Sequence, residues 1–431
     1  MREGRRPKVA GRSVDHAASA ITWRRYTIRM RGSQLAWVMS MGQVGSLLPH
    51  VVVPAVMASH LIPLWGLSNA QAGLLAASYS AGYMLAVPVL TSLTDRTDAR
   101  GLLLGGSLVS AAATMAFAVF ADGLPSAALL WSVAGIGFAG AYMPGLRALT
   151  DRLDPGDQSR SITLYTSSYS VGVGMSFLVS QIVADSLGWR WAFAITGIGP
   201  LLMAMIAWAM PPVRRSGRIE EQLLDFRPVI RNRGAMGYIL SYGAHCFELY
   251  GMRTWIVAFW TFVVARHDRD ASFDPVTVSV IVSLLAMPAS ILGNELSIRI
   301  GRRRAIASIQ VTSAFVALAI GLAAGSSPVL LMVLIVVYAI TVPADSGSLT
   351  AGMFASADSH RRGATMALHS AVGFGFAAIA GWTIGAALDS FGGASAERGW
   401  LAGFGVLAAG IACGPLALCW GRRQPPRHAA K

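Results

Sequence analysis

Three ionisable side chains stand close together within one apolar stretch of this 431-residue chain. They are His245, Glu248 and Arg253, in the run GAHCFELYGMRTW that begins at Gly243. Such a set can hold a proton, bind an anion or form an ion pair, and burial makes each charge costly. His245 and Glu248 share a helix face, whereas Arg253 lies about 140° around a straight helix from Glu248. We predict that a local break at Gly251 brings Arg253 back towards them.

This run has two interpretations. In the first, Glu248 carries a proton that is coupled to the movement of a solute, and Arg253 attracts an anion. In the second, Glu248 forms a structural pair with His245 or Arg253 that holds neighbouring helices in register. Both interpretations stay open from the sequence, and the first is the working hypothesis because an ionisable group in an apolar helix is a functional candidate by default.

Other ionisable residues lie alone within apolar stretches. Asp345, in the segment PADSGS, interrupts an apolar run; it can hold a proton or a cation, or make a helix-packing hydrogen bond. His50 follows Pro49, which should kink its helix. The His50 side chain can bind a solute or be satisfied by a neighbouring carbonyl group. His369 is a further candidate for the same kind of site.

Three more side chains are candidates for this site. Tyr142 and Tyr338 carry hydroxyl groups that can orient a substrate, or else their rings serve helix packing. Arg147 ends an apolar stretch and adds a positive charge there. We therefore predict a substrate-binding or ion-coupling site assembled from several apolar segments.

The apolar composition indicates which elements position these residues. The chain is 54% hydrophobic and 13% charged, whereas soluble proteins have about 25% charged residues. Many apolar runs reach the ~20 residues of a membrane-spanning helix, and the alternation of barrel strands is absent. The sequence predicts an all-α polytopic membrane protein with twelve transmembrane helices. The spans lie near residues 36–60, 69–91, 101–121, 126–148, 161–184, 190–211, 235–264, 276–298, 304–325, 328–350, 363–388 and 399–420.

The distribution of basic residues orients these spans. Thirty of the 35 Lys and Arg residues fall in the tails and turns on one side of the predicted membrane. Four lie on the other side, and Arg253 lies within a span. Basic residues concentrate in cytoplasmic loops, so we predict that both termini are cytoplasmic. The net charge of +14 then sits at a lipid bilayer surface, and no nucleic-acid partner is needed.

An internal repeat divides the spans into two six-helix halves. The segment RSIT at Arg160 recurs as RGAT at Arg362, and VGVG at Val171 recurs as VGFG at Val372. Both offsets are about 200 residues, and such a period indicates duplicated structural units. We predict a basic tail over 1–33, halves over 34–211 and 235–421, a central loop over 212–234, and a second tail over 422–431.

Several classes of function are disfavoured by missing motifs. Cys246, Cys413 and Cys419 lie in apolar segments without metal-ligand spacing. The sequence contains no phosphate-binding loop, no HExxH metal motif and no nucleophile elbow. We therefore predict that the chain is not an enzyme and needs neither a cofactor nor a metal ion.

Two charged turns occupy corresponding places in the two halves. The first contains Asp95, Arg96 and Arg100 between spans two and three. The second, between spans eight and nine, contains basic residues and a glycine, with an isoleucine at the position of the acid: Arg299, Gly301, Arg303, Arg304 and Ile298. A carboxylate at the end of a span can pair with arginine or cap a neighbouring helix.

The first charged turn resembles the signature of the major facilitator superfamily (MFS), Gly-x-x-x-Asp-Arg/Lys-x-Gly-x-Arg/Lys-Arg/Lys. The twelve predicted spans and the repeat of this chain are also similar to that family. Thr91 and Asp98 replace the two glycines of the signature, and Gly101 its last basic residue. The resemblance implies two halves that rock around a central site lined by spans one, four, seven and ten. It also implies a cytoplasmic gating motif, in which Asp95 pairs in one state only; the alternative is a simple topological anchor.

The resemblance and the intramembrane charges together predict function. We expect a proton-coupled secondary active transporter that moves a small polar or anionic solute by alternating access. We expect it to act as a monomer in a bacterial inner (plasma) membrane. The seventh span also resembles cyanate- and anion-type permeases. Two alternatives stay open: a proton-driven drug or metabolite exporter of the same fold, and a transporter-like membrane sensor. Trp131 stands where drug antiporters carry arginine, which disfavours the exporter.

Overall fold

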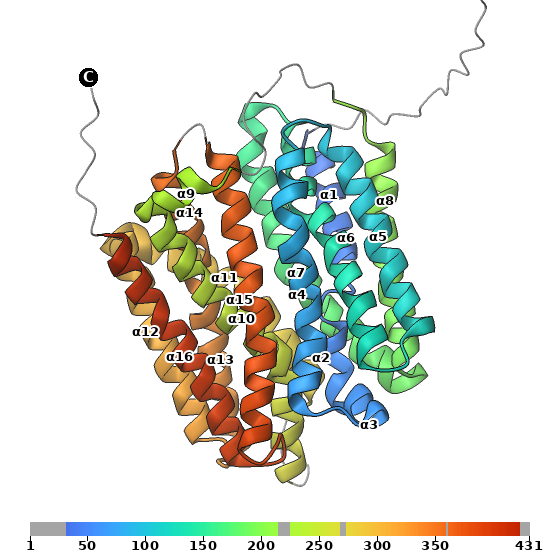
Figure 1. The fold of residues 1–431 in the computed structure, drawn as a ribbon, viewed down its shortest axis with the longest axis vertical. Coiled ribbons are helices and arrows are strands. Elements are labelled where there is room, and N and C mark those ends of the chain that lie inside the picture. The colour runs from blue at the N-terminus through green and yellow to red at the C-terminus, as the bar shows by residue number, and fades with distance from the viewer. Residues whose placement is uncertain (1–31, 214–224, 268–272, 359–360, 423–431) are drawn as a thin grey trace, which may run out of the picture.

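The computed structural model describes residues 32–213, 225–267, 273–358 and 361–422, and the described part is helical without strands. The helices form two groups that lie side by side (Figure 1). The first group contains α1 (Gly32–Leu47), α2 (Val52–Val56), the π-helical turn η1 (Met57–Leu61), α3 (Ile62–Trp65), α4 (Asn69–Leu93), α5 (Ala99–Phe120), α6 (Leu124–Thr150), α7 (Pro155–Leu187) and α8 (Trp189–Ala209).

The second group begins with a short helix and then repeats the arrangement of the first group. It contains α9 (Arg227–Arg231), α10 (Arg233–Arg266), α11 (Pro275–Ile300), α12 (Arg302–Leu322), α13 (Pro328–Ala344), α14 (Ser346–Ser356), α15 (Arg362–Ser390) and α16 (Glu397–Gly421). Ten of the described spans are long and apolar enough to cross a membrane, and the bent pair formed by α1 and α2–α3 makes another. The 34-residue α10 completes the predicted twelve, so the all-α, two-half membrane fold is confirmed.

Two spans are interrupted where the sequence predicts it, and one is not. The first span bends by 47° after α1, next to Pro49. The tenth span is broken at Asp345, which ends α13 and precedes α14. The break predicted at Gly251 is wrong, because α10 runs without interruption. Gly251 instead admits close packing: a Cβ there would lie 2.7 Å from side-chain atoms of Ile384 and Leu407.

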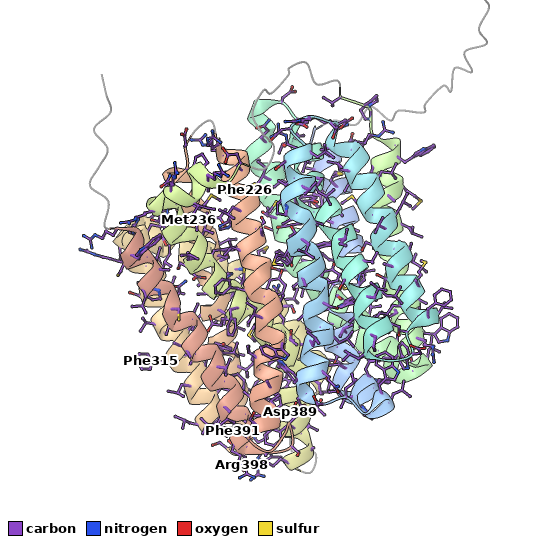
Figure 2. All side chains as sticks on the ribbon, viewed as in Figure 1. Phe226, Met236, Phe315, Asp389, Phe391 and Arg398 are labelled. Carbon is purple, nitrogen blue, oxygen red and sulfur yellow. The ribbon has the colours of Figure 1, made fainter. Side chains whose placement is uncertain are left out.

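The bundle has two ends that the following sections distinguish. The motif end holds the turn 94–98 between α4 and α5, together with α9, and lies uppermost in Figure 1. The distal end holds α3 and the turn 391–396 between α15 and α16. Figure 2 labels Asp389, Phe391 and Arg398 at the distal end and Phe226 at the motif end.

Glycines allow the two halves to meet at backbone distance. A Cβ on Gly73 of α4 would lie 2.1 Å from the carbonyl oxygen of Gly381 on α15, and one on Gly385 would lie 2.2 Å from that of Asn69. Because no side chain fits there, these helices are held in direct contact near the distal end. This contact positions the side chains of α4, α10 and α15 around the interface between the halves.

Candidate substrate and coupling site

A line of three polar side chains crosses from one half to the other. His50 lies in the turn between α1 and α2, and its Nε2 is 2.9 Å from the hydroxyl of Tyr169 on α7. The same hydroxyl is 2.9 Å from that of Tyr250 on α10. His50 and Tyr169 belong to the first half and Tyr250 to the second, so this hydrogen-bonded line depends on the relative position of the halves.

Arg253 lies beside this line, one turn further along α10 than Tyr250. Its side chain is buried, and its guanidinium carbon is 5.6 Å from the ring centre of Tyr169 and 5.5 Å from that of Tyr250. Its Nη1 has no hydrogen-bond partner, and none of the ion pairs found among the described residues includes it. A buried cation without a counter-ion is unfavourable, so this position attracts an anion.

Aromatic rings surround the arginine on both sides of the interface. Tyr142 on α6 stacks on Phe138 at 5.7 Å and meets Tyr169 edge-on at 5.3 Å. Across the halves, Tyr83 of α4 stacks on Phe374 of α15 with ring centres 3.7 Å apart. Tyr142 therefore lies beside Tyr169, one of the two rings that face Arg253. Flat rings of this kind favour a planar or apolar portion in any bound solute.

A cavity of about 20 Å³ adjoins Arg253 and is lined by the turn between α1 and α2 and by α2, α4, α10 and α15. It has room for about one water molecule. His50 Nδ1 and the Tyr79 hydroxyl, which belong to residues lining this cavity, are buried without hydrogen-bond partners. The cavity is small, yet two polar groups around it lack partners. We interpret it as a site that is closed in this conformation and has unused hydrogen-bonding capacity.

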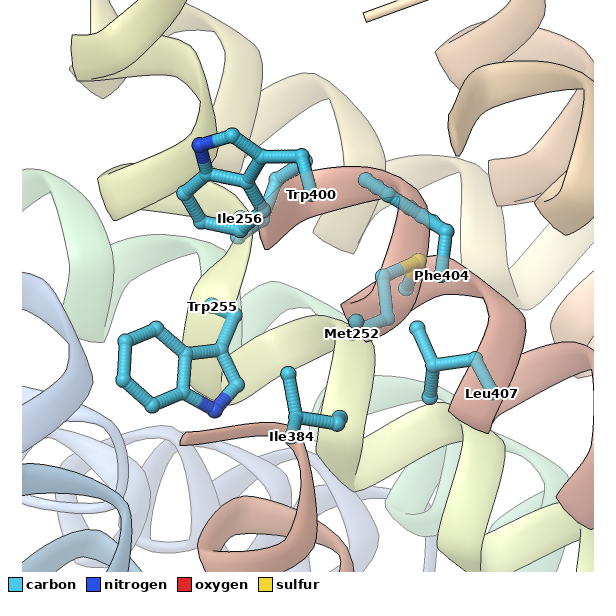
Figure 3. Close-up of a pocket in the computed structure, with 8 residues that line it drawn as sticks. Met252, Trp255, Ile256, Ile384, Trp400, Phe404 and Leu407 are labelled. Atoms are coloured by element: carbon cyan, nitrogen blue, oxygen red, sulfur yellow. The ribbon is translucent and has the colours of Figure 1, made fainter. Parts of the chain in front are cut away.

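A second gap, of about 10 Å³, lies within the second half and is drawn in Figure 3. Side chains of Met252, Trp255, Trp400, Phe404 and Leu407 surround it. The Trp255 indole N–H donates to the carbonyl oxygen of Gly381 at 3.1 Å. This gap has no polar lining that could orient a charged solute, so the Arg253 cavity is the better candidate.

A separate polar cluster lies inside the second half. His245 Nδ1 of α10 is 2.7 Å from Asp345 Oδ1, an ion-pair distance without the alignment of a hydrogen bond. Gln310 of α12 donates to Asp345 Oδ2 at 2.7 Å, and the same amide nitrogen donates to the Ser241 hydroxyl at 3.0 Å. The break between α13 and α14 thus places Asp345 between α10 and α12.

Glu248 reaches the same region through different partners. The Ser313 hydroxyl of α12 donates to Glu248 Oε1 at 2.8 Å and lies 3.3 Å from the Thr341 hydroxyl. Glu248 therefore pairs with neither His245 nor Arg253, and neither of the structural pairs considered from the sequence is present. Because α10 is unbroken, Arg253 lies at the interface between the halves, where it attracts an anion. His245 and Glu248 point into the second half, where each takes part in a contact with a buried carboxylate.

Two further predicted site residues, His369 and Tyr338, also lie in the second half. His369 of α15 stacks on Tyr242 at 3.8 Å, and Tyr242 in turn lies 5.5 Å from the ring of His245. Tyr338 is fully buried on α13, where its carbonyl oxygen accepts a hydrogen bond from the Thr341 hydroxyl. His369 therefore belongs to the surroundings of His245, and Tyr338 lies beside Glu248.

Arg147 lies at the motif end, away from the cavity beside Arg253. Its Nε is 3.0 Å from Asp151, and its Nη2 is 3.9 Å from Asp95. Arg96 is exposed in the turn beside Asp95. The structure thus groups Arg147 with the gating motif, whereas the sequence placed it among the substrate-binding candidates.

Equivalent arginines of the two charged turns make equivalent contacts. Arg100 of α5 donates to the carbonyl oxygens of Ala207 and Trp208 at 2.8 and 2.9 Å, in the last turn of α8. Arg303 of α12 donates at 2.7 Å to Leu418, in the last turn of α16. Cations are favourable at helix C-termini. The repeat therefore extends to individual contacts.

The second turn differs in how its helix begins. Gly301 precedes α12 with φ +91°, a conformation that favours glycine. Arg299 lies in the last turn of α11. The first turn uses Asp98 at the corresponding place, where its side chain caps α5 by accepting from the Arg100 N–H. The helix cap that Asp98 supplies in the first turn is thus replaced in the second turn by the backbone conformation of Gly301.

Asp98 is a motif-end anchor that the sequence did not suggest, because it replaces a signature glycine. Besides the Arg100 N–H, it accepts from Arg152 Nη2 at 3.0 Å and from the Val213 N–H at 2.9 Å. Partial burial alone would raise the pKa of Asp98. The hydrogen bonds from Val213 and Arg100 and the charge of Arg152 outweigh it and hold the pKa below its ordinary value.

Asp98→Asn is therefore expected to lower the free energy of unfolding by roughly 2 kcal/mol at neutral pH. It leaves the buried guanidinium of Arg152 without its carboxylate. Because the folded-state pKa of Asp98 is depressed, its stabilisation is present above the ordinary carboxyl pKa and is lost as pH falls through the folded value. Melting curves of both proteins between about pH 7 and pH 3 should converge at the acid end. A constant gap would contradict the linkage, and Asp122→Asn serves as the control.

The geometry and repeat agree with a comparison against protein-family models. The model described as Major Facilitator Superfamily matches residues 39–294. The chain belongs to the major facilitator superfamily. Superfamily members of known structure share its fold: a bacterial homolog of the human lysosomal transporter Spinster, in an inward-facing and unoccupied conformation, has a TM-score of 0.69 at 16% identity, over 90% of this chain and 95% of that one.

Two curated superfamily relatives are transporters of small solutes. The niacin transporter NiaP of Acinetobacter baylyi is 23% identical over 309 residues, which are 63% of this chain and 69% of the relative. The 4-hydroxybenzoate transporter PcaK of Pseudomonas putida is 26% identical over 171 residues, which are 39% of this chain and 36% of the relative. These similarities indicate secondary transport of a small solute.

Several residues of the candidate site were not predicted from the sequence. Tyr169 and Tyr79 each share an apolar span with a second tyrosine, Tyr165 and Tyr83 respectively, and resemble packing residues. Gln310 and Ser313 lie on the ninth span, which the resemblance did not place at the cavity. The signal that existed for Gln310 was its amide, a rare polar group in an apolar run. The contacts of these residues depend on which helices pack against each other, and the hydrophobic periodicity of the sequence does not show that.

Proposed function

We propose that this chain is a secondary active transporter that binds a small organic anion at Arg253 and is driven by protons. Alternating access around the His50–Tyr169–Tyr250 line moves the solute. The observation that carries the proposal is the buried guanidinium of Arg253, which faces two tyrosine rings and has an unpartnered Nη1. An anion would supply the missing counter-charge.

The groups near Arg253 favour a carboxylate attached to a flat or apolar body. Arg253 offers a planar fork of donors that matches a carboxylate. The Tyr79 hydroxyl, and His50 Nδ1 in the appropriate tautomer, can add further hydrogen bonds. Tyr142 and Phe138 supply the flat apolar surface. Niacin and 4-hydroxybenzoate, which name two relatives, each combine an aromatic ring with a carboxylate, and this supports the same solute class.

The polar cluster of the second half is proposed to carry the coupling protons. Asp345 and Glu248 are both buried, and no Lys or Arg among the described ion pairs accompanies them. Buried carboxylates in a membrane helix are favourable when they are protonated or paired. His245 can exchange a proton with Asp345 across their 2.7 Å contact, so the pair can hold a proton that is released when the halves rearrange.

The orientation and setting are proposals of the same kind. The turns at the motif end carry Arg96, Arg100, Arg299 and Arg303, and basic loops favour the cytoplasmic side. We therefore assign the motif end to the cytoplasm of a bacterial inner membrane, with both termini on that side and one chain as the working unit. On this assignment Asp95 belongs to the cytoplasmic gate.

Matched pairs of acids and amides test the proposed solute class. Purified protein is mixed with nicotinate or nicotinamide, and with 4-hydroxybenzoate or its amide, and melting is followed. The acid of at least one pair is expected to raise the melting temperature at concentrations at least about tenfold lower than its amide, because a ligand that binds the folded state stabilises it. Equal stabilisation by acid and amide, or stabilisation by organic cations instead, would overturn the assignment of an anion site.

A further inference from the structure

Asp389, in the last turn of α15, caps the first turn of α4 from the opposite half. Its Oδ1 accepts from the backbone N–H of Asn69 at 3.0 Å and from the Asn69 amide nitrogen at 2.7 Å. Its Oδ2 accepts from the backbone N–H of Ala70 at 2.8 Å. The unpaired N–H groups and dipole at a helix start favour a carboxylate. Three charge-assisted hydrogen bonds thus join the halves at the distal end.

The opposite end of the same two helices holds the matching arrangement. Asp95 follows the end of α4, and a Cβ placed on Gly363, in the first turn of α15, would lie 3.1 Å from Asp95 Oδ2. The two helices run in opposite directions, since α4 begins at the distal end and α15 begins at the motif end (Figure 1). Asp95, after the end of α4, therefore lies against the start of α15. Asp389, in the last turn of α15, lies against the start of α4.

We propose that Asp389 is a distal latch, reciprocal to Asp95 at the motif end, and that it must release α4 before the distal end opens. The acid that is missing from the second charged turn is then found at the other end of α15. The proposal assumes the alternating access proposed above but is independent of the identity of the solute.

The surroundings of Asp389 make it the natural point of release. Behind it, Gly73 and Gly381 bring the two backbones into contact, and such close packing has no bonds to break beyond van der Waals contacts. Among the described residues, a further polar contact between the halves near this end, Gln181 Nε2 to the Ser279 hydroxyl at 3.0 Å, is neutral. Charge-assisted bonds are roughly twice as strong as neutral ones, so Asp389 dominates the polar link.

Other distal acids make contacts within one half and so provide controls. Asp122 accepts from the Ser126 hydroxyl within the first half. Glu397 pairs with Arg266 within the second half. Removing the Asp122 carboxylate changes the charge of the same end by the same amount without touching the link between the halves.

Distances between spin labels across the distal end test the latch in the full chain. Nitroxides are attached at Leu64 on α3 and Phe391 after α15, both exposed, in a background where the three cysteines are serine. Double electron–electron resonance is recorded without solute. Asp389→Ala is expected to raise the ratio of long to short distances roughly fivefold, the size of a lost helix cap. Asp389→Asn, which keeps one acceptor oxygen, should fall between Ala and the parent.

The same measurement decides against the proposal in two ways. If Asp389→Ala leaves the distances as in the parent, or if Asp122→Ala moves them as far, Asp389 is no latch. Intact short distances in the parent also confirm that the labelled protein has folded. Because no solute is present, a failure of the anion-site proposal leaves this result unaffected, and a failure here leaves acid binding at Arg253 unaffected.

Discussion

Arg253→Gln is expected to reduce uptake of the transported anion at least about thirtyfold, because truncating one partner of a buried charge pair costs roughly 2–5 kcal/mol. The glutamine keeps a hydrogen-bond donor but is shorter and removes the charge that faces Tyr169 and Tyr250. Uptake of the anion is measured in vesicles, together with its binding to the purified protein. Both binding and uptake should fall, since the arginine contacts the solute itself.

Two companion variants sharpen this result. Arg253→Lys keeps the charge but loses the planar fork, so binding should recover in part. Arg266→Gln changes an arginine of the same helix at the distal end, where it pairs with Glu397, and should leave binding of the anion at the parental level. Undiminished binding in Arg253→Gln, in protein that melts like the parent, would remove Arg253 from the site.

Asp345→Asn is expected to abolish accumulation of the solute driven by a pH gradient while exchange of solute across the membrane continues. The asparagine imitates a permanently protonated carboxyl group, so the pair with His245 can no longer gain and lose a proton. Vesicles with an imposed pH gradient report accumulation, and loading with unlabelled solute reports exchange. The loss should bring accumulation down to the level reached without a gradient.

Glu248→Gln then separates the two buried carboxylates. If Asp345 alone carries the proton, Glu248→Gln weakens the contact with Ser313 but leaves pH-driven accumulation; if both take part, both variants lose it. Glu295→Gln, an exposed position on α11, serves as the control. Accumulation at the parental level in both buried variants would exclude this cluster as the coupling site.

The fold followed from the sequence because its signals are local or periodic. Apolar runs long enough to span a bilayer reported the helices, and the repeat reported the two halves. The kink next to Pro49 and the break at Asp345 followed from residues at the interruptions themselves. The break predicted at Gly251 failed because a glycine in a helix also serves close packing, here against Ile384 and Leu407.

The site was predictable as a set of residues but not as a set of contacts. His245, Glu248 and Arg253 stand out in the sequence, yet the structure places Arg253 at the interface between the halves and the other two inside the second half. Their partners, such as Tyr169 and Gln310, are uncharged residues on other helices, and nothing in their own neighbourhoods marks them. Spacing along one helix fixes the face of each side chain, whereas its partners depend on how separate helices cross.

The 20 Å³ cavity beside Arg253 has a consequence for any affinity that is measured. A ring-bearing acid cannot enter a space the size of one water molecule, so it binds only those molecules in which the surrounding rings have already separated. The observed dissociation constant is then the intrinsic constant divided by the fraction of such molecules. A weak apparent affinity is therefore compatible with a tight intrinsic one, and the arrival rate of the solute reports how often the site opens.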